Sequence, residues 1–271
     1  MIDAMPCTDD VIAHNREAWN ASAPQHRDTP AWQRLCDAVR NERFNCFDAT
    51  LNTLLSQLDL SGKRVIQLGC NNGREVLSLF ALGAREAVGV DQSAAFLEHA
   101  QALSALSPHA PTFIEADIHH LPASLTQHFD VALITIGVLN WMPDLGAFLR
   151  HVASTLVPGG HLVIYETHPF LEVFEPSAAD PWQVARSYFQ REPLVEDGAI
   201  VYEGQGQAIG LPSYWHLYTL GDLFNGLLAA GLHLRGFAEY AHSNREDLYD
   251  LYEQGGERQV PMCYTLVAQK A

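Results

Sequence analysis

A turn rich in glycine and asparagine is the first part of the sequence that could bind a ligand. Val65, Ile66 and Leu68 form an apolar run that is long enough for a buried parallel strand and too short for a helix. Residues 69–73 form the turn, and a helical pattern follows them. Such a turn lets a ligand approach the backbone and leaves N–H groups unpaired at the start of the helix. Asn71 suits a backbone position with positive φ, because asparagine tolerates the left-handed region.

Two carboxylates and one histidine lie where later strands are expected to end. Asp91 ends the second expected strand, Asp117 ends the third, and His168 follows the fifth. The carboxyl ends of parallel strands meet at one edge of a sheet, where ligands bind. A carboxylate there can accept hydrogen bonds from hydroxyl groups, and a neutral histidine can take a proton near pH 7. Each residue also has a structural interpretation: Asp91 as a helix cap, Asp117 as a turn residue, and His168 as a strand-end cap before Pro169.

Strands and helices alternate over most of the chain, which indicates βαβ units and a parallel sheet. The helix that begins after Asp144 is expected to run to Leu156 and to end at the Pro-Gly-Gly turn of residues 158–160. The alternation breaks between residues 167 and 218, where aromatic residues and prolines are frequent. The expected helices are at 9–24, 31–59 (one or two), 74–82, 93–103, 144–156 and 219–230, and the expected strands at 64–68, 86–92, 112–118, 129–136, 161–165, 232–240 and 263–268.

Composition limits the classes of function. The formal net charge is −16, from 32 acidic and 16 basic side chains, and such a field repels the phosphates of nucleic acid. Five cysteines form no C-x-x-C pair, as expected for reduced thiols. No apolar run is long enough to span a membrane, and the N-terminus lacks a signal-peptide pattern. We therefore expect a cytoplasmic protein with no nucleic-acid or membrane partner, and no metal, because His119-His120 lacks a spaced carboxylate or cysteine.

The turn after the first strand does not match a dinucleotide fingerprint, because Asn71 and Arg74 stand where the second and third glycines are required. It resembles instead the first motif of class I S-adenosylmethionine (SAM) methyltransferases, an acidic residue followed by x-G-x-G-x-G. Gly69 and Gly73 are retained, Asn71 replaces the middle glycine, and Gln67 replaces the acidic residue.

This resemblance runs from about residue 60 to residue 271 and implies a SAM cofactor. It implies that Asp91 binds the ribose hydroxyls, that Asp117 meets the adenine amino group, and that Ile118 lines the adenine ring. Backbone carbonyls near Ile136 would accept from the methionine ammonium group. The implied cofactor site comprises Gln67, Gly69, Asn71, Asn72, Gly73, Asp91, Gln92, Asp117, Ile118, Thr135, Ile136 and Gly137.

The resemblance also implies a Rossmann-like, doubly wound α/β fold. Its sheet would have seven strands in the order 3-2-1-4-5-7-6, with the last strand antiparallel. We expect a single domain, in which residues 1–60 form a helical lid, residues 61–166 and 219–271 the SAM-binding core, and residues 167–218 an insertion that caps the substrate. A homodimer is a possible assembly.

Two further segments resemble bacterial small-molecule methyltransferases, Asn-Arg-x-x-Trp-Asn at residues 15–20 and Tyr-Glu-x-His-Pro at residues 165–169. We predict methyl transfer from SAM to an oxygen or nitrogen of a small molecule, with His168 as the general base. The aromatic side chains could equally form the insertion's own core, Glu166 could pair with the N-terminal helix, and Trp19 could attach that helix to the sheet. The predicted substrate wall comprises Trp19, Trp141, Glu166, Tyr188, Tyr202, Tyr214, Trp215 and His216.

Three other functions compete with this prediction. The first is methyl transfer to carbon, and the second is a non-catalytic SAM-binding module. The third is a nicotinamide-dependent oxidoreductase, which the two missing glycines of the turn disfavour.

Overall fold

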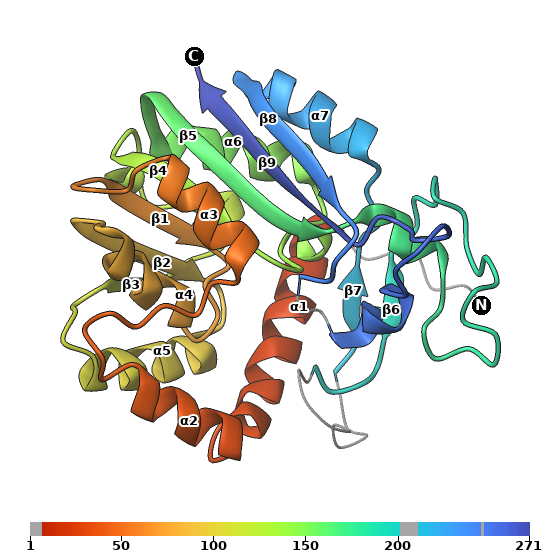
Figure 1. Ribbon diagram of the computed structural model, residues 1–271, viewed down its shortest axis with the longest axis horizontal. Coiled ribbons are helices and arrows are strands. Elements are labelled where there is room, and N and C mark those ends of the chain that lie inside the picture. Colours follow the sequence, from red (N-terminus) through yellow and green to blue (C-terminus); the bar gives the residue numbers. More distant parts are fainter. Residues whose placement is uncertain (1–6, 201–210, 245–246) are drawn as a thin grey trace.

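The computed structural model describes residues 7–200, 211–244 and 247–271. A twisted sheet lies between two layers of helices, and a smaller lobe lies beside the sheet (Figure 1). Among the described residues, no helix is long and apolar enough to cross a membrane. The α-helices are α1 (Thr8–Ser22), α2 (Pro30–Ala38), α3 (Ala49–Gln57), α4 (Arg74–Ser78), α5 (Ala94–Leu106), α6 (Leu145–Thr155) and α7 (Leu220–Ala229).

The large sheet has the predicted topology. Its order is β3-β2-β1-β4-β5-β9-β8, and β9 runs antiparallel to both of its neighbours. The order therefore reverses at β1, which pairs in parallel with β2 on one side and β4 on the other. The strands are β1 (Arg64–Leu68), β2 (Glu86–Asp91), β3 (Thr112–Glu115), β4 (Phe129–Ile134), β5 (Leu156–Thr167), β8 (Leu232–Tyr240) and β9 (Cys263–Lys270), with β6 (Leu194–Glu196) and β7 (Ser213–Trp215) in a separate two-stranded sheet.

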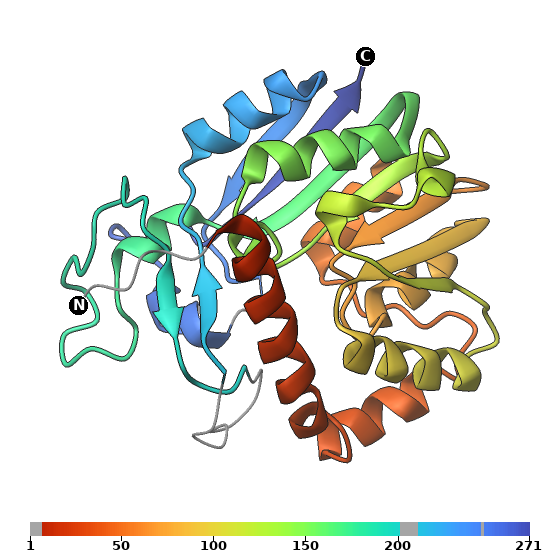
Figure 2. The same ribbon diagram turned by 180° about the vertical axis from the view of Figure 1, so that it is seen from behind.

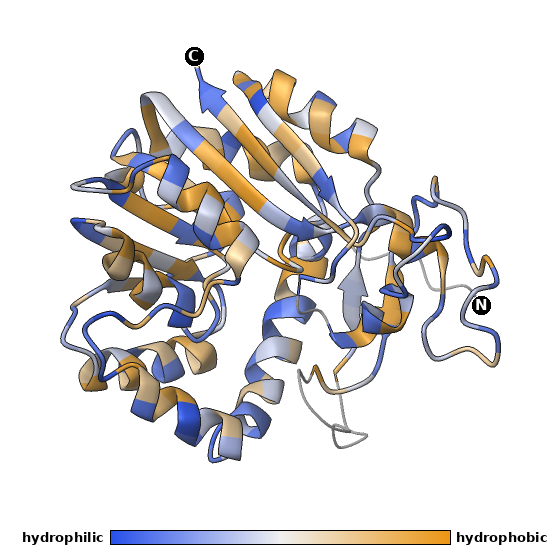
Figure 3. Cartoon of the chain, in the orientation of Figure 1, coloured by the Kyte–Doolittle hydropathy of each residue, from blue (hydrophilic) through white to orange (hydrophobic). Residues whose placement is uncertain are grey.

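Successive side chains along the strands point to opposite faces of the sheet, and they fill two hydrophobic cores. In β1, Val65 packs on one side with Leu51 of α3, whereas Ile66 packs on the other with Phe148 of α6. Helices α3, α4 and α5 thus cover one face, and α6 and α7 cover the other. The central strands are apolar along most of their length (Figure 3), as expected for a parallel sheet that is buried on both faces.

Several predicted boundaries were wrong. Helix α6 ends at Thr155, and Leu156 already pairs with Phe129 of β4. The next pair joins residues 131 and 161, so the Pro-Gly-Gly segment lies in an irregular part of β5 and does not end the helix. Strand β3 ends at Glu115 instead of residue 118. The one or two helices predicted at 31–59 are two, α2 and α3, which agrees with the prediction.

The lobe contains more of the chain than the predicted insertion. Its small core joins Leu171, Val173 and Phe174 to Tyr249 and Tyr252, which lie between β8 and β9. The residues between β8 and β9 were assigned to the SAM-binding core from the sequence, but those around Tyr249 and Tyr252 pack in the lobe. Aromatic rings that contact one another hold this core together, as in the stacked pair Phe174–Tyr252 at 5.1 Å between ring centroids.

The turn after β1 has the backbone conformation that its residue types require. Asn71 has φ 49°, as predicted, and Gly69 and Gly73 have φ 73° and 71°. A Cβ at Gly73 would lie 2.5 Å from Cζ of Phe113 and 3.0 Å from Cβ of Ala100. Gly73 therefore serves both the positive φ and the close packing of the turn against β3 and α5.

We predict that Gly73→Ala lowers the free energy of unfolding more than Gly62→Ala does. Both glycines have nearly the same φ, 71° and 70°, but a Cβ at Gly62 meets nothing within 4 Å. The left-handed backbone should cost either alanine about 1–2 kcal/mol. Displacing Phe113 should cost Gly73→Ala a further ~1–3 kcal/mol. Urea denaturation of both variants measures the difference, and equal losses would show that the ring moves aside freely.

Candidate functional site

A cavity of about 540 Å³ lies at the carboxyl ends of β1, β2 and β4 and extends into the lobe. We call the part lined by residues 67–142 the core half and the part lined by residues 172–249 the lobe half. All of the predicted cofactor-site residues except Gly73 line the core half. The cavity therefore lies where the strand order reverses, as the topology predicts.

Asp91, at the end of β2, is hydrogen-bonded to the glycine-containing turn. Its Oδ2 accepts from the backbone N–H of Asn71 at 2.7 Å, and its Oδ1 accepts from that of Ser93 at 2.9 Å. Burial raises the pKa of Asp91, although these N–H groups and that of Gln92 act to lower it. Asp91 thus supports the turn and the start of α5, and it also lines the cavity.

The acidic group missing at Gln67 is supplied from α4. Oε2 of Glu75 accepts from Nε2 of Gln67 at 2.6 Å and from Oγ1 of Thr135 at 2.7 Å. All three residues are buried, and all three line the cavity. Within the described part of the chain, Oε1 of Gln67 has no hydrogen-bond partner, so it can accept one from a ligand. The residue pattern around Glu75 did not indicate this role.

Asp117 holds the segment after β3. Its Oδ1 accepts from the backbone of His119 at 2.9 Å, and its Oδ2 lies 2.7 Å from Nδ1 of His120. Burial acts to raise the pKa of Asp117, but the hydrogen bonds from both histidines outweigh burial and lower this pKa to about 2. Asp117 is therefore an anion at neutral pH, and it lines the cavity beside Ile118. Among the described residues, no three His, Cys, Asp or Glu side chains are grouped so as to hold a metal ion.

Glu166, near the end of β5, ties this strand to the segment after β4. Its Oε2 accepts from the backbone N–H of Gly137 at 2.9 Å and from that of Thr167 at 3.0 Å. The side chain is 2% exposed and lines the cavity. The sequence left open whether Glu166 lines the substrate pocket or pairs with the N-terminal helix. In the structure its side chain faces the cavity.

Helix α1 lies between the core and the lobe (Figure 2), and its residues Ile12 and Trp19 line the cavity. Asn15 is fully buried, and its side chain both accepts from the backbone N–H of Tyr214 at 2.8 Å and donates to the carbonyl of Tyr214 at 3.1 Å. Oδ1 of Asn20 accepts from Oγ of Ser93 at 2.8 Å at the start of α5. The Asn-Arg-x-x-Trp-Asn motif therefore attaches α1 to β7 at one end and to the core at the other.

Three tryptophans form a contiguous aromatic wall. The ring centroid of Trp141 lies 5.3 Å from that of Trp19 and 5.1 Å from that of Trp215, both in edge-to-face geometry. All three line the cavity, as predicted. Trp19 also contacts Phe96 of α5, so it anchors α1 as well as lining the site.

Three other predicted wall residues, Tyr188, Tyr214 and His216, do not line the cavity. The hydroxyl of Tyr188 accepts from the backbone of Leu220 at 3.0 Å, so Tyr188 braces the start of α7. Tyr214 contributes its backbone to Asn15, and the His216 ring stacks on Tyr218. Tyr202 lies outside the described residues.

His168 does not have the position that its predicted role requires. Its Nδ1 accepts from the backbone N–H of Phe170 at 3.1 Å, and its Nε2 lies 2.8 Å from Oε1 of Glu239. Both ring nitrogens are engaged outside the cavity, and His168 does not line it. Burial lowers the pKa of His168, whereas Glu239 acts to raise it. His168 is the N-cap of a short 3-10 helix, η6 (Pro169–Val173), which is the structural interpretation.

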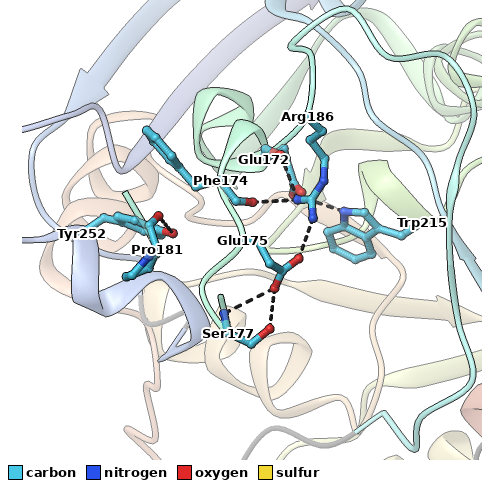
Figure 4. A network of polar contacts seen from close by, with 8 residues as sticks. All are labelled: Glu172, Phe174, Glu175, Ser177, Pro181, Arg186, Trp215 and Tyr252. Atoms are coloured by element: carbon cyan, nitrogen blue, oxygen red, sulfur yellow. Dashed lines mark hydrogen bonds and ion pairs between the residues drawn. The ribbon is translucent and has the colours of Figure 1, made fainter. Parts of the chain in front are cut away.

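Sequence reasoning missed the polar residues of the lobe half. Glu172, Glu175, Arg186 and Glu196 line it and come from a segment whose sequence has no helical or strand periodicity. Figure 4 shows the first three. The guanidinium of Arg186 forms an ion pair with Glu175. The feature of the sequence that could have indicated these residues is the presence of several glutamates in residues 167–218, the segment expected to cap the substrate.

We predict that Asn15→Ala lowers the free energy of unfolding by about 2–4 kcal/mol, because it leaves buried backbone groups of Tyr214 without partners. Asn45→Ala is the matched control, since the Asn45 side chain bonds Asn52 at an exposed position. It should change stability by less than about 0.5 kcal/mol. Chemical denaturation of both variants tests this, and similar losses would mean that Asn15 does not attach α1 to the lobe.

Part of this chain is similar in sequence to methyltransferases. Residues 59–186 match the family model of a methyltransferase domain. A tRNA U34 carboxymethyltransferase of Idiomarina loihiensis is 32% identical over 110 residues, which make up 39% of this chain and 33% of that protein. A phthiotriol/phenolphthiotriol dimycocerosates methyltransferase of Mycobacterium leprae is 31% identical over 152 residues, or 55% of this chain and 53% of that protein. The chain thus spans about a third to a half of these relatives.

A solved structure resembles the whole chain. The magnesium protoporphyrin IX methyltransferase of Synechocystis PCC 6803, with bound S-adenosylhomocysteine (SAH), superposes with a TM-score of 0.57 at 16% identity. The match covers 97% of this chain and 100% of that one, and at this identity it shows the fold alone. Residues 59–186 therefore belong to the methyltransferase-domain family, and the chain has the fold of class I SAM-dependent methyltransferases.

Proposed function

We propose that the protein transfers a methyl group from SAM to a nitrogen or oxygen of a small molecule. The observation that carries this proposal is the position of Asp91 at the end of β2, where it is hydrogen-bonded to the turn after β1 and lies in the wall of the cavity of about 540 Å³. This is the crevice at which open α/β sheets bind ligands.

The core half of the cavity fits SAM. Asp91 offers a partly buried carboxylate for the ribose hydroxyls, and Asp117 offers an anionic acceptor for the adenine amino group. The partnerless Oε1 of Gln67 and the adjoining carboxylate of Glu75 supply negative charge suited to an ammonium group. The Synechocystis enzyme of the same fold was solved with SAH, the product that SAM leaves after methyl transfer.

When bound, SAM supplies a methyl group activated by a sulfonium. The contribution of the protein is to align an acceptor with that group and to keep water away. Trp19, Trp141 and Trp215 form a contiguous aromatic wall of the cavity, and Ile12 of α1 lines it as well. These contacts suit an acceptor that enters from the lobe half.

Nucleic acid is the competing acceptor, because one relative is a tRNA U34 carboxymethyltransferase. The charge of this chain favours a small molecule. Its net charge of −16 repels a phosphate backbone, and carboxylates line the lobe half. The mycobacterial relative is a lipid methyltransferase by name, so the family's acceptors are not confined to RNA.

We predict that Asp91→Asn weakens the binding of SAM and of SAH by similar factors. Losing charge-assisted hydrogen bonds of roughly 1.5–3 kcal/mol corresponds to an affinity loss of about 10- to 150-fold. Calorimetry with both ligands measures it. Asp144→Asn is the control, since Asp144 also accepts a hydrogen bond from a backbone N–H near the start of a helix, that of Ala147 in α6, but lies outside the cavity. An affinity within about twofold of native, in a variant with a native circular-dichroism spectrum, would reduce Asp91 to a cap.

A second experiment separates the two acceptor classes. Methyl-labelled SAM is incubated with the protein and either total tRNA or a tRNA-free metabolite extract. We expect label in the metabolite fraction, because the acidic surface opposes RNA binding. Label confined to tRNA would overturn the small-molecule part of the proposal while leaving methyl transfer intact.

A further inference from the structure

Glu172 places a buried carboxyl group in the wall of the lobe half. It lies in η6, just beyond the end of β5, and is 7% exposed. Its Oε1 accepts from the indole N–H of Trp215 at 3.1 Å (Figure 4). It also accepts a hydrogen bond from the Tyr249 side chain. Both Trp215 and Tyr249 line the cavity as well.

The nearby guanidinium of Arg186 is bonded to groups other than the Glu172 carboxyl. Arg186 donates to the backbone carbonyls of Glu172 and Phe174, at 3.0 and 2.7 Å, and its ion pair is with Glu175. Burial raises the pKa of the Glu172 carboxyl to about 7. The hydrogen bonds from Trp215 and Tyr249 and the charge of Arg186 act to lower this pKa, and Glu196 acts to raise it. Around neutral pH this carboxyl can therefore accept or hold a proton.

Negative charge exceeds positive charge in the lobe half. Among the described residues, the carboxylates of Glu172, Glu175 and Glu196 line it together with the guanidinium of Arg186. The indole ring of Trp215 also lines the lobe half, and it contacts the ring of Trp141 in the core half. Carboxylates and aromatic faces both attract a cation and disfavour an anion.

We propose that the methyl acceptor is an amine, which binds in the lobe half as an ammonium ion, and that Glu172 takes its proton. This inference rests on the proposed function, since it names the acceptor of that reaction. An ammonium group beside Glu172 supplies the counter-ion that this carboxylate lacks, and its organic part lies against the tryptophans.

The proposed step is balanced in atoms and charge. A proton moves from the ammonium nitrogen to the Glu172 carboxylate, which leaves a neutral amine and a neutral carboxylic acid. The lone pair of the nitrogen then forms a bond to the donated methyl carbon. The bond from that carbon to sulfur breaks, and its electron pair stays on the sulfur. The methylated ammonium product carries the positive charge that the sulfonium has lost.

Matched probes test the recognition directly. The binding of tryptamine, tryptophol and indole-3-acetate, and of 2-phenylethylamine, 2-phenylethanol and phenylacetate, is measured by calorimetry on SAH-saturated protein. Within each set the organic part is the same and only the amine, hydroxyl or carboxylate differs. We expect the amine to bind at least about tenfold more tightly than its two counterparts, as an added hydrogen bond between charged groups would give.

Two variants assign the effect to Glu172. Glu172→Gln keeps the shape of the side chain but removes its charge, so the amine preference should fall at least about tenfold. Glu192→Gln is the matched control, because it removes the same charge from an exposed position outside the cavity. It should leave the preference unchanged.

The native protein gives a second test that needs no variant. The probe amines stay protonated between pH 6 and pH 8, whereas Glu172 ionises through its pKa of about 7. Amine affinity should therefore rise about tenfold over this range, and alcohol affinity should stay constant. A ¹³C-carboxyl NMR resonance that titrates near pH 7 and is lost in Glu172→Gln would identify the group.

The outcomes separate this inference from the proposed function. Amine preference that rises with pH and depends on Glu172 supports it. If SAH binds but no amine is preferred, including the case in which no probe binds, the inference is overturned and the proposed function stands. If SAH itself does not bind, the proposed function fails first.

Discussion

The structure around the cavity depends on how the carboxylate of Asp91 is held at the end of β2, next to β1, where the strand order reverses. Asp91 is partly buried, and a carboxylate that has lost part of its contact with water needs hydrogen bonds to remain charged. The turn after β1 supplies an N–H group at 2.7 Å, which requires the left-handed backbone of Asn71. That turn in turn needs Gly73, whose missing side chain makes room for Phe113. One electrostatic requirement thus links the turn, β2 and the packing of β3.

Around this point the cavity is built from two kinds of structure. The core half takes its polar groups from the ends of regular strands, where the backbone determines their positions. The lobe half takes them from a segment with little regular structure, in which side chains hold one another. Arg186 is an example, because it bonds two backbone carbonyls and the Glu175 carboxylate at once. The first half is preorganised by the sheet, and the second depends on its own polar network.

How far the sequence predicted the site follows from this division. Periodicity located the strands, so Asp91 and Asp117 were found at strand ends, and the antiparallel β9 followed from the resemblance. Glu172 was missed because an irregular segment has no period that tells which side chains face inward. His168 shows the opposite error. Its place after β5 was predicted correctly, but its ring turns to cap η6, a rotation that spacing along the chain does not determine.

Helix α1 joins the two sides of the cavity, and this has a consequence for ligand exchange. It is attached to β7 through Asn15 and to the start of α5 through Asn20. Helix α1 therefore bridges the lobe and the core. Either of these two attachments can be lost while the other remains. Release at Asn15 frees the side next to the lobe, and release at Asn20 frees the side next to the core. The cofactor and the acceptor can then exchange on different sides of α1, one controlled by the Asn20 contact and the other by the Asn15 contact.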